Sequence, residues 1–151
     1  PDPAIQTALD RALADLRAIG TIDIGRIDTI VQRLEDELCA TAFDAFYDAA
    51  GEETEAGAVI DFALLRYVAS PAVQRELTER GEAGLAPTLL LNAPHPSVRT
   101  EARARVIDLV DAGAPRDQLP DPDWLTELDA SFPGEGYDTL KDLCEGTRPA
   151  R

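Results

Sequence analysis

The chain has 151 residues, and its hydrophobic (44%) and charged (28%) fractions are ordinary for one globular domain, expected here over residues 1–151. The excess of 29 acidic over 14 basic side chains gives a net charge of −15, which argues against nucleic acid as a partner. No apolar run reaches the roughly 18 residues of a membrane-spanning helix, so we expect no membrane partner and a cytoplasmic location. One Lys against thirteen Arg indicates a GC-rich, bacterial genome.

Apolar residues recur every three or four positions through the first half of the chain, which is typical of amphipathic helices. One such stripe covers residues 5–16 and predicts a helix that ends at Gly20. A second stripe runs from Ile27 to Phe46 and predicts a single helix of twenty residues or more, which ends at Gly51.

The segment AGAVIDFALLRYVA at residues 56–69 is apolar around almost its whole circumference. A helix of this kind is normally central and buried. Its two charged residues, Asp61 and Arg66, must therefore either lie at an edge or find partners. Ser70 and Pro71 end this helix, because proline disfavours helix in the residue before it and suits the first turn of the next helix.

Shorter helices, separated by proline and glycine, make up the second half of the chain, and alternating β-branched runs are absent. The chain is therefore predicted to be all-α, a compact array of about seven or eight helices. The expected helices of this half lie at 71–80, 83–92 and 97–112, followed in a proline-punctuated tail (115–151) by pieces at 122–130 and 136–145.

The order short helix, short helix, long helix at residues 71–112 resembles an armadillo repeat. The text SPAVQRELTERGEAGLAPTLLLNAPHPSVRTEARARVIDLVDAG has a small residue and Pro before its first helix, a Gly-bearing turn, a leucine-rich second helix and Pro-x-Val opening the third. The preceding ALLRYVAS is similar to the end of an earlier repeat, so the resemblance covers residues 58–112. It implies an armadillo/HEAT-like centre that stacks on neighbouring helices. An unrelated helical bundle is the alternative.

Charge is distributed unevenly along the chain. Residues 1–65 carry a net charge of −10, residues 66–116 a net charge of +1, and residues 117–151 a net charge of −6. The repeat-like centre is therefore close to neutral and lies between two acidic flanks.

The candidate partner-binding residues are Arg66, Tyr67, Arg99 and Arg103. Arg99 and Arg103 are four residues apart and so share one flank of their helix, which the resemblance places toward the concave groove of a solenoid. A guanidinium group can receive a carboxylate or a phosphate of a partner in bidentate fashion. Pairing of these arginines with the abundant Asp and Glu of the same chain is the alternative.

The sequence contains no recognisable catalytic or metal-binding pattern. His95 is the only histidine and lies between two prolines, so a site built on two histidines is impossible and a surface turn is expected. Cys39 and Cys144 are expected to be reduced thiols, with a disulfide that ties the tail to the body as the alternative. Phosphate-binding loops, nucleophile elbows and calcium loops are also missing. We therefore expect no enzyme, no catalytic residues, no metal and no cofactor.

Two functions fit these observations. The first is a non-catalytic protein–protein interaction module, a small α-solenoid-like adaptor or scaffold domain. The alternative is an acidic immunity protein or antitoxin that neutralises a basic toxin or a nucleic-acid-binding protein. A groove binder would use the four candidate residues, whereas a neutraliser would use the acidic N-terminal helices or the tail. Strong weakening of partner binding by salt would favour the acidic surface.

Overall fold

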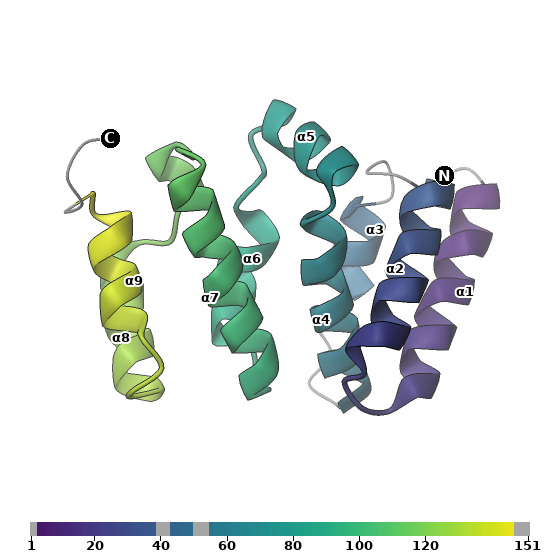
Figure 1. Ribbon diagram of the computed structural model, residues 1–151, viewed down its shortest axis with the longest axis horizontal. Helices are drawn as coiled ribbons and strands as arrows, with labels where there is room; N and C mark the ends of the chain where they lie inside the picture. Colours follow the sequence, from purple (N-terminus) through teal and green to yellow (C-terminus); the bar gives the residue numbers. More distant parts are fainter. Residues whose placement is uncertain (1–2, 39–42, 50–54, 147–151) are drawn as a thin grey trace. The chain divides into compact units, whose positions relative to one another are not determined.

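The computed structural model describes residues 3–38, 43–49 and 55–146 (Figure 1). Within these residues the protein is all-α, with nine α-helices, two short 3-10 helices and no strand, which confirms the predicted fold class. No helix in this part of the chain is long and apolar enough to cross a membrane. Contacts between residues divide the chain into two compact units, Pro1–Gly81 (unit 1) and Glu82–Arg151 (unit 2).

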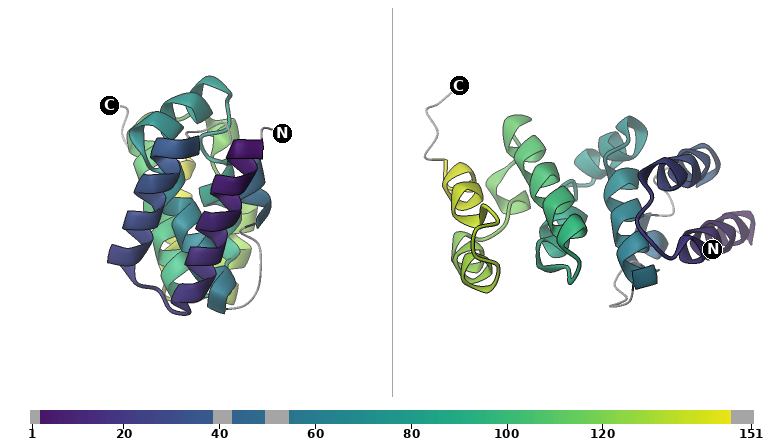
Figure 2. Two further views of the ribbon diagram at one scale, coloured as in Figure 1. Left: turned by 90° about the vertical axis from the view of Figure 1, so that its right-hand side faces the viewer. Right: turned by 60° about the horizontal axis from the view of Figure 1, so that its bottom comes forward.

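Unit 1 is built around its fourth helix, as the apolar circumference of that segment predicts. The helices of the unit are α1 (Pro3–Ile19), α2 (Ile24–Leu38), α3 (Phe43–Ala49), α4 (Glu55–Val68) and α5 (Pro71–Glu79). Helix α4 contacts all four of the others, and α1, α2 and α4 lie side by side (Figures 1 and 2). Val59, Ile60 and Leu65 on α4 are completely buried. The burial of apolar side chains around most of α4 thus stabilises unit 1.

The single long helix predicted from the stripe Ile27–Phe46 is wrong in one respect, because the structure has two helices there. Helix α2 ends at Leu38 and α3 begins at Phe43. Residues 39–42, which include Cys39, lie outside the described residues. Ile27 and Phe46 are nevertheless both buried in unit 1. The apolar period identifies the buried face of each helix but does not locate the boundary between them.

Unit 2 consists of shorter helices arranged around α7. The elements are α6 (Leu85–Leu89), η2 (Leu90–Asn92), α7 (Pro96–Asp111), η3 (Arg116–Gln118), α8 (Pro122–Ser131) and α9 (Tyr137–Cys144). Helix α7 contacts α6, η2 and α9, while α8 pairs with α9. The completely buried side chains of this unit come from several elements: Leu91, Val98, Ala102, Val106, Leu125 and Tyr137.

Proline begins helices α5, α7 and α8, where its missing N–H is not needed and its fixed φ suits a helix. The residue before each proline is extended, as the steric effect of proline predicts. The ψ angles of these residues are 145°, 129° and 131° at Ser70, His95 and Asp121. The starting residues of three helices are therefore determined locally.

A close backbone contact joins the start of α6 to η3. Gly84 precedes α6, and a Cβ atom at this position would lie 1.8 Å from the carbonyl oxygen of Gln118. No side chain can occupy that space unless the backbone moves. Gly84 therefore allows residues 116–118 to pack directly on the beginning of α6.

Candidate functional site

Two of the predicted partner-binding residues, Arg99 and Arg103, are engaged within unit 2. Both project from α7 toward Glu135, which lies in the connection between α8 and α9. Arg99 donates through Nε and Nη2 to the two carboxylate oxygens of Glu135, at 3.0 Å each. Arg103 donates through Nη1 to Oε1 of the same carboxylate at 2.9 Å. The structure therefore brings the two arginines together around a carboxylate of the same chain.

Further contacts close the surroundings of Arg99. Its Nη1 donates to the carbonyl oxygens of Ala93 and Pro94 at 2.9 and 3.0 Å, and its guanidinium carbon lies 3.9 Å from the centre of the Phe132 ring. Only 6% of Arg99 is exposed. Most of its N–H donors are used, so it can bind an external anion only if Glu135 is displaced.

The second arginine of the cluster is also enclosed. Arg103 donates through Nη2 to Oγ1 of Thr100 at 3.1 Å, and its guanidinium carbon is 5.0 Å from the centre of the Tyr137 ring. The Tyr137 hydroxyl donates to the carbonyl oxygen of Leu91 in η2. We call this set the Arg99 cluster, and its members are Arg99, Arg103, Phe132, Glu135 and Tyr137.

The electrostatics of the Arg99 cluster are those of a satisfied ion pair. Hydrogen bonds from Arg99 lower the pKa of the Glu135 carboxyl, against the opposing effect of desolvation, and Arg103 lowers it further. Burial raises the pKa of Tyr137. Both groups therefore hold one charge state at neutral pH, glutamate ionised and tyrosine neutral, which suits a structural link better than proton transfer.

The other two candidates, Arg66 and Tyr67, lie on α4 in unit 1. Arg66 forms a bidentate ion pair with Asp28 of α2, with Nε–Oδ1 and Nη2–Oδ2 distances of 2.8 and 2.9 Å. Tyr67 is 1% exposed, and its ring centre lies 5.2 Å from that of Phe46. The Arg66–Asp28 ion pair thus links α4 to α2, and the Tyr67 side chain belongs to the core of unit 1. Their use by a partner stays a prediction.

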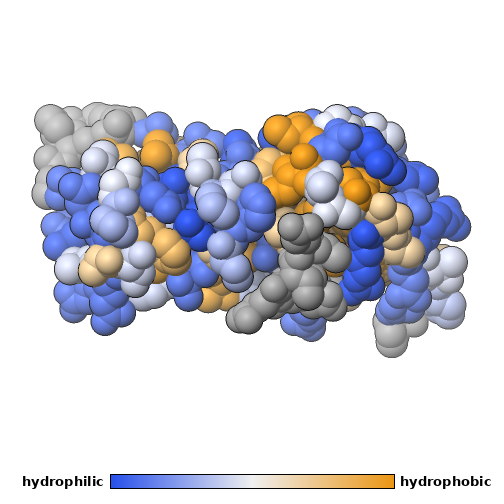
Figure 3. Space-filling model, turned by 90° about the horizontal axis from the view of Figure 1, so that it is seen from below, coloured by the Kyte–Doolittle hydropathy of each residue, from blue (hydrophilic) through white to orange (hydrophobic). Residues whose placement is uncertain are grey.

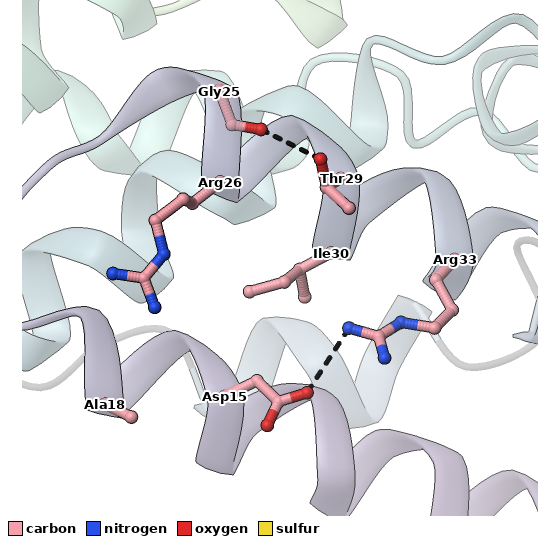
Figure 4. Close-up of a pocket in the computed structure, with 7 residues that line it drawn as sticks. All are labelled: Asp15, Ala18, Gly25, Arg26, Thr29, Ile30 and Arg33. Carbon is pink, nitrogen blue, oxygen red and sulfur yellow. Dashed lines mark hydrogen bonds and ion pairs between the residues drawn. The ribbon is translucent and has the colours of Figure 1, made fainter.

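An open pocket between α1 and α2 contains two arginines that the sequence analysis did not select. It has a volume of about 360 Å³ (Figure 4). Arg26 and Arg33 extend from α2 toward α1, and Arg33 donates through Nη2 to Oδ2 of Asp15 at 3.3 Å. The spacing of seven residues, which puts both arginines on one face of a helix, could have drawn attention to them. The lining residues are Asp15, Ala18, Gly25, Arg26, Thr29, Ile30 and Arg33.

The only histidine has a structural role in α7. Nδ1 of His95 accepts a hydrogen bond from the backbone N–H of Ser97 at 3.2 Å, which caps the beginning of the helix. A turn was predicted here, but the cap was not, because histidine is not among the common capping residues.

The described part of the chain contains a buried free thiol and no cluster of side chains arranged to hold a metal ion. Cys144 is a buried free thiol, and burial raises its pKa to about 11 although Arg116 opposes the shift, so the thiolate is scarce at neutral pH. Residues 3–38, 43–49 and 55–146 contain no group of three or more His, Cys, Asp or Glu side chains arranged to hold a metal ion. The prediction that Cys39 and Cys144 are reduced thiols, with a disulfide as the alternative, depends on Cys39, which lies outside the described residues.

Comparison with known proteins gives no relative: no protein-family model matches the chain, and no curated protein or solved structure is significantly similar to it.

Proposed function

We propose that this protein is a non-catalytic module that binds another protein, and that its partner is basic. The proposal rests on one observation: in a chain with twice as many acidic as basic side chains, many of the basic ones form ion pairs with carboxylates of the same chain. Described cations that pair with carboxylates of the same chain are Arg33, Arg66, Arg80, Arg99, Arg103, Arg105 and Lys141. A surplus of carboxylates remains for recognition, and it would attract a positively charged partner.

The last turn of α2 is the part of this acidic surface that we assign to the partner. It contains Glu35, Asp36 and Glu37 and no basic residue, and the latter two are exposed. Carboxylates at the C-terminal end of a helix are opposed by the helix dipole, so a cationic partner would relieve an unfavourable arrangement. The face seen from below in Figure 3 is largely hydrophilic, with hydrophobic patches among the polar residues.

The second candidate is a more specific role, that of an immunity protein or antitoxin. Such a protein would cover a basic toxin or nucleic-acid-binding protein, and the same surplus of acidic side chains favours it. It differs from an adaptor in its consequence, because the neutralised partner loses activity when bound. The armadillo/HEAT relation is also a proposal. It is supported by the order of α5, α6 and α7, which are short, short and long as predicted.

The experiment is capture of partners from an extract of the source cells with three matched baits. In the first, Glu35→Gln, Asp36→Asn and Glu37→Gln remove three charges from the end of α2. The control changes three carboxylates of α8: Asp123→Asn, Glu127→Gln and Asp129→Asn. The third bait, Arg66→Gln with Arg103→Gln, tests one predicted partner-binding arginine from each unit.

We expect a basic protein to be captured, with at least a tenfold loss for the α2 bait, a change below twofold for the α8 bait, and steep weakening between 50 and 500 mM salt. Equal losses with both acidic baits would overturn the assignment to α2. Loss confined to the arginine bait would instead support use of the predicted arginines by the partner. Inhibition of the captured protein's own activity would distinguish a neutraliser from an adaptor.

A further inference from the structure

The pocket between α1 and α2 contains an arginine, Arg26, whose side chain pairs with no other described residue. The Arg26 guanidinium extends into the space between the two helices (Figure 4). Among the described residues it has no hydrogen-bond or ion-pair partner, and only its backbone N–H is engaged, with Oδ1 of Asp23 at 3.2 Å. The one carboxylate among the lining residues, that of Asp15, pairs with Arg33 and not with Arg26.

The position of Arg26 is also unfavourable for the helix that carries it. It lies in the first turn of α2, where the helix dipole disfavours a positive side chain. The next residue toward the N-terminus, Gly25, lowers the helix propensity of the same turn and leaves that part of the pocket wall without a side chain. Arginine and glycine at these two positions do not favour the helix, but together they leave a positively charged group accessible in the pocket.

The rest of the pocket has an apolar part and a polar end. Ala18 of α1 and Ile30 of α2 supply apolar surface. At the other end, the Arg33–Asp15 pair is long, at 3.3 Å, and its side chains are 46% and 43% exposed, so it is weak and exchangeable. Arg33 lies two helical turns from Arg26, a separation of about 10 Å along the axis. The excess charge of the lining is positive, since Asp15 offsets one of the two arginines.

From these features we propose that the α1–α2 pocket binds a small organic oxyanion, a carboxylate or a phosphate attached to a short apolar group. The oxyanion accepts bidentate hydrogen bonds from Arg26, and the apolar group lies over Ile30 and Ala18. Arg33 can leave Asp15 to contact a second oxygen of the ligand. The volume, about 360 Å³, is at the lower end of the range of ligand sites and suits a metabolite-sized molecule. This inference is independent of the protein partner proposed above.

Calorimetric and NMR titrations of the intact chain at constant ionic strength test the proposal. The probes are butyrate, butyl phosphate and inorganic phosphate, with butylammonium as the probe of opposite charge. We expect saturable binding of butyrate or butyl phosphate in the millimolar range or tighter, with shifts of the amides of residues 15–18 and 25–33. Weaker binding of inorganic phosphate would show that the apolar group contributes, and the stronger butyl compound identifies the preferred oxyanion.

Two single variants with the same change of charge make the test specific. Arg26→Gln should weaken binding at least tenfold, whereas Arg11→Gln, at an exposed position of α1 that does not line the pocket, should change it less than twofold. Both should keep the thermal stability of the parent chain, because neither side chain has a described partner. Equal weakening by both variants, absence of saturation, or comparable binding of butylammonium would overturn the proposal.

Discussion

In unit 1 the central helix α4 is apolar apart from the buried Asp61 and the partly exposed Arg66, whereas in unit 2 the central helix α7 carries a buried arginine. Leu65 on α4 is completely buried among apolar neighbours, and the ion pair of the adjacent Arg66 with Asp28 is partly exposed, at 31% and 46%. Arg99 on α7 is 6% exposed and is surrounded by Glu135, Phe132 and backbone carbonyl groups. Chemically similar arginine–carboxylate pairs thus lie in different environments.

This difference shows that burial, more than the identity of the two residues, determines what an ion pair contributes to the stability of the fold. An exposed pair is screened by water and adds little to stability. A buried pair adds little compared with apolar packing, but removal of one member leaves an uncompensated charge in a medium that solvates it poorly. Loss of the buried Arg99 in unit 2 should therefore destabilise the chain more than loss of the partly exposed Arg66 in unit 1.

The largest effect is expected for Gly84→Ala in unit 2. The new Cβ would lie 1.8 Å from the Gln118 carbonyl oxygen, so either α6 or the segment 116–118 must move. We expect a loss of about 4 kcal/mol in the free energy of unfolding, in the range of severe point mutations. Urea unfolding followed by the fluorescence of Trp124, the only tryptophan and a residue of α8, measures it. A loss below 1 kcal/mol would contradict the close packing of these two segments.

The next largest effect is the difference in the free energy of unfolding between the variants Arg99→Ala and Arg66→Ala. The first leaves the partly buried Glu135 carboxylate without its bidentate partner and opens space beside Phe132, so we expect a loss of about 3 kcal/mol. The second removes a partly exposed pair and should cost about 1 kcal/mol or less. Chemical denaturation of both variants, with hydrogen exchange to assign the loss to a unit, checks the contrast. Similar losses for the two variants would refute the role given to burial.

A smaller effect should appear as a dependence on pH. The folded-state pKa of Glu135 is lowered, so its ion pair stabilises the folded chain above the unfolded-state pKa of about 4.3, and the contribution is lost as the pH falls through the folded-state value. Glu135→Gln should therefore destabilise the protein at pH 7, and the difference from the parent chain should shrink between pH 5 and pH 3. Unfolding midpoints from Trp124 fluorescence at several pH values provide the measurement. A constant difference would show that the carboxylate charge is not involved.

The smallest effect is expected for Gly25→Ala in unit 1, which is the counterpart of the change at Gly84. A Cβ at this position meets only the Asp23 carboxylate, at the ordinary contact distance of 3.7 Å. Alanine is the better helix former, so we expect a gain of up to about 1 kcal/mol. Protection of α1 and α2 amides from hydrogen exchange should rise accordingly. Destabilisation would indicate that the first turn of α2 is more crowded than the structure shows.

Much of the fold could be predicted from the sequence because apolar spacing reports directly on the buried face of a helix. The stripe that includes Leu9, Leu13 and Leu16 is buried as expected, and the apolar segment 56–69 forms the central helix α4. For the two charged residues of that segment, the sequence allows either a position at an edge or pairing with other residues. Arg66 pairs with Asp28 and Asp61 is buried, so the charges of α4 were resolved by tertiary structure rather than by local pattern.

The candidate site could be predicted only in part because ion pairing depends on residues distant in sequence. Glu135 is 36 residues from Arg99, and nothing in the local sequence distinguishes it from the many other carboxylates of the chain. Pairing within the chain was recognised as the alternative for Arg99 and Arg103, and the structure shows that pairing. The pocket around Arg26 could not be found from the sequence, because it requires the relative placement of α1 and α2.

The proline residues at the beginnings of α5, α7 and α8 have a consequence for engineering of the chain. Each helix start is fixed by a rigid ring and an extended residue before it, not by the length of the preceding connection. Flexible insertions placed just upstream of Pro122, after η3, should therefore lengthen a connection while the register of the following helix stays unchanged. Such a site is suitable for inserted tags or reporter peptides.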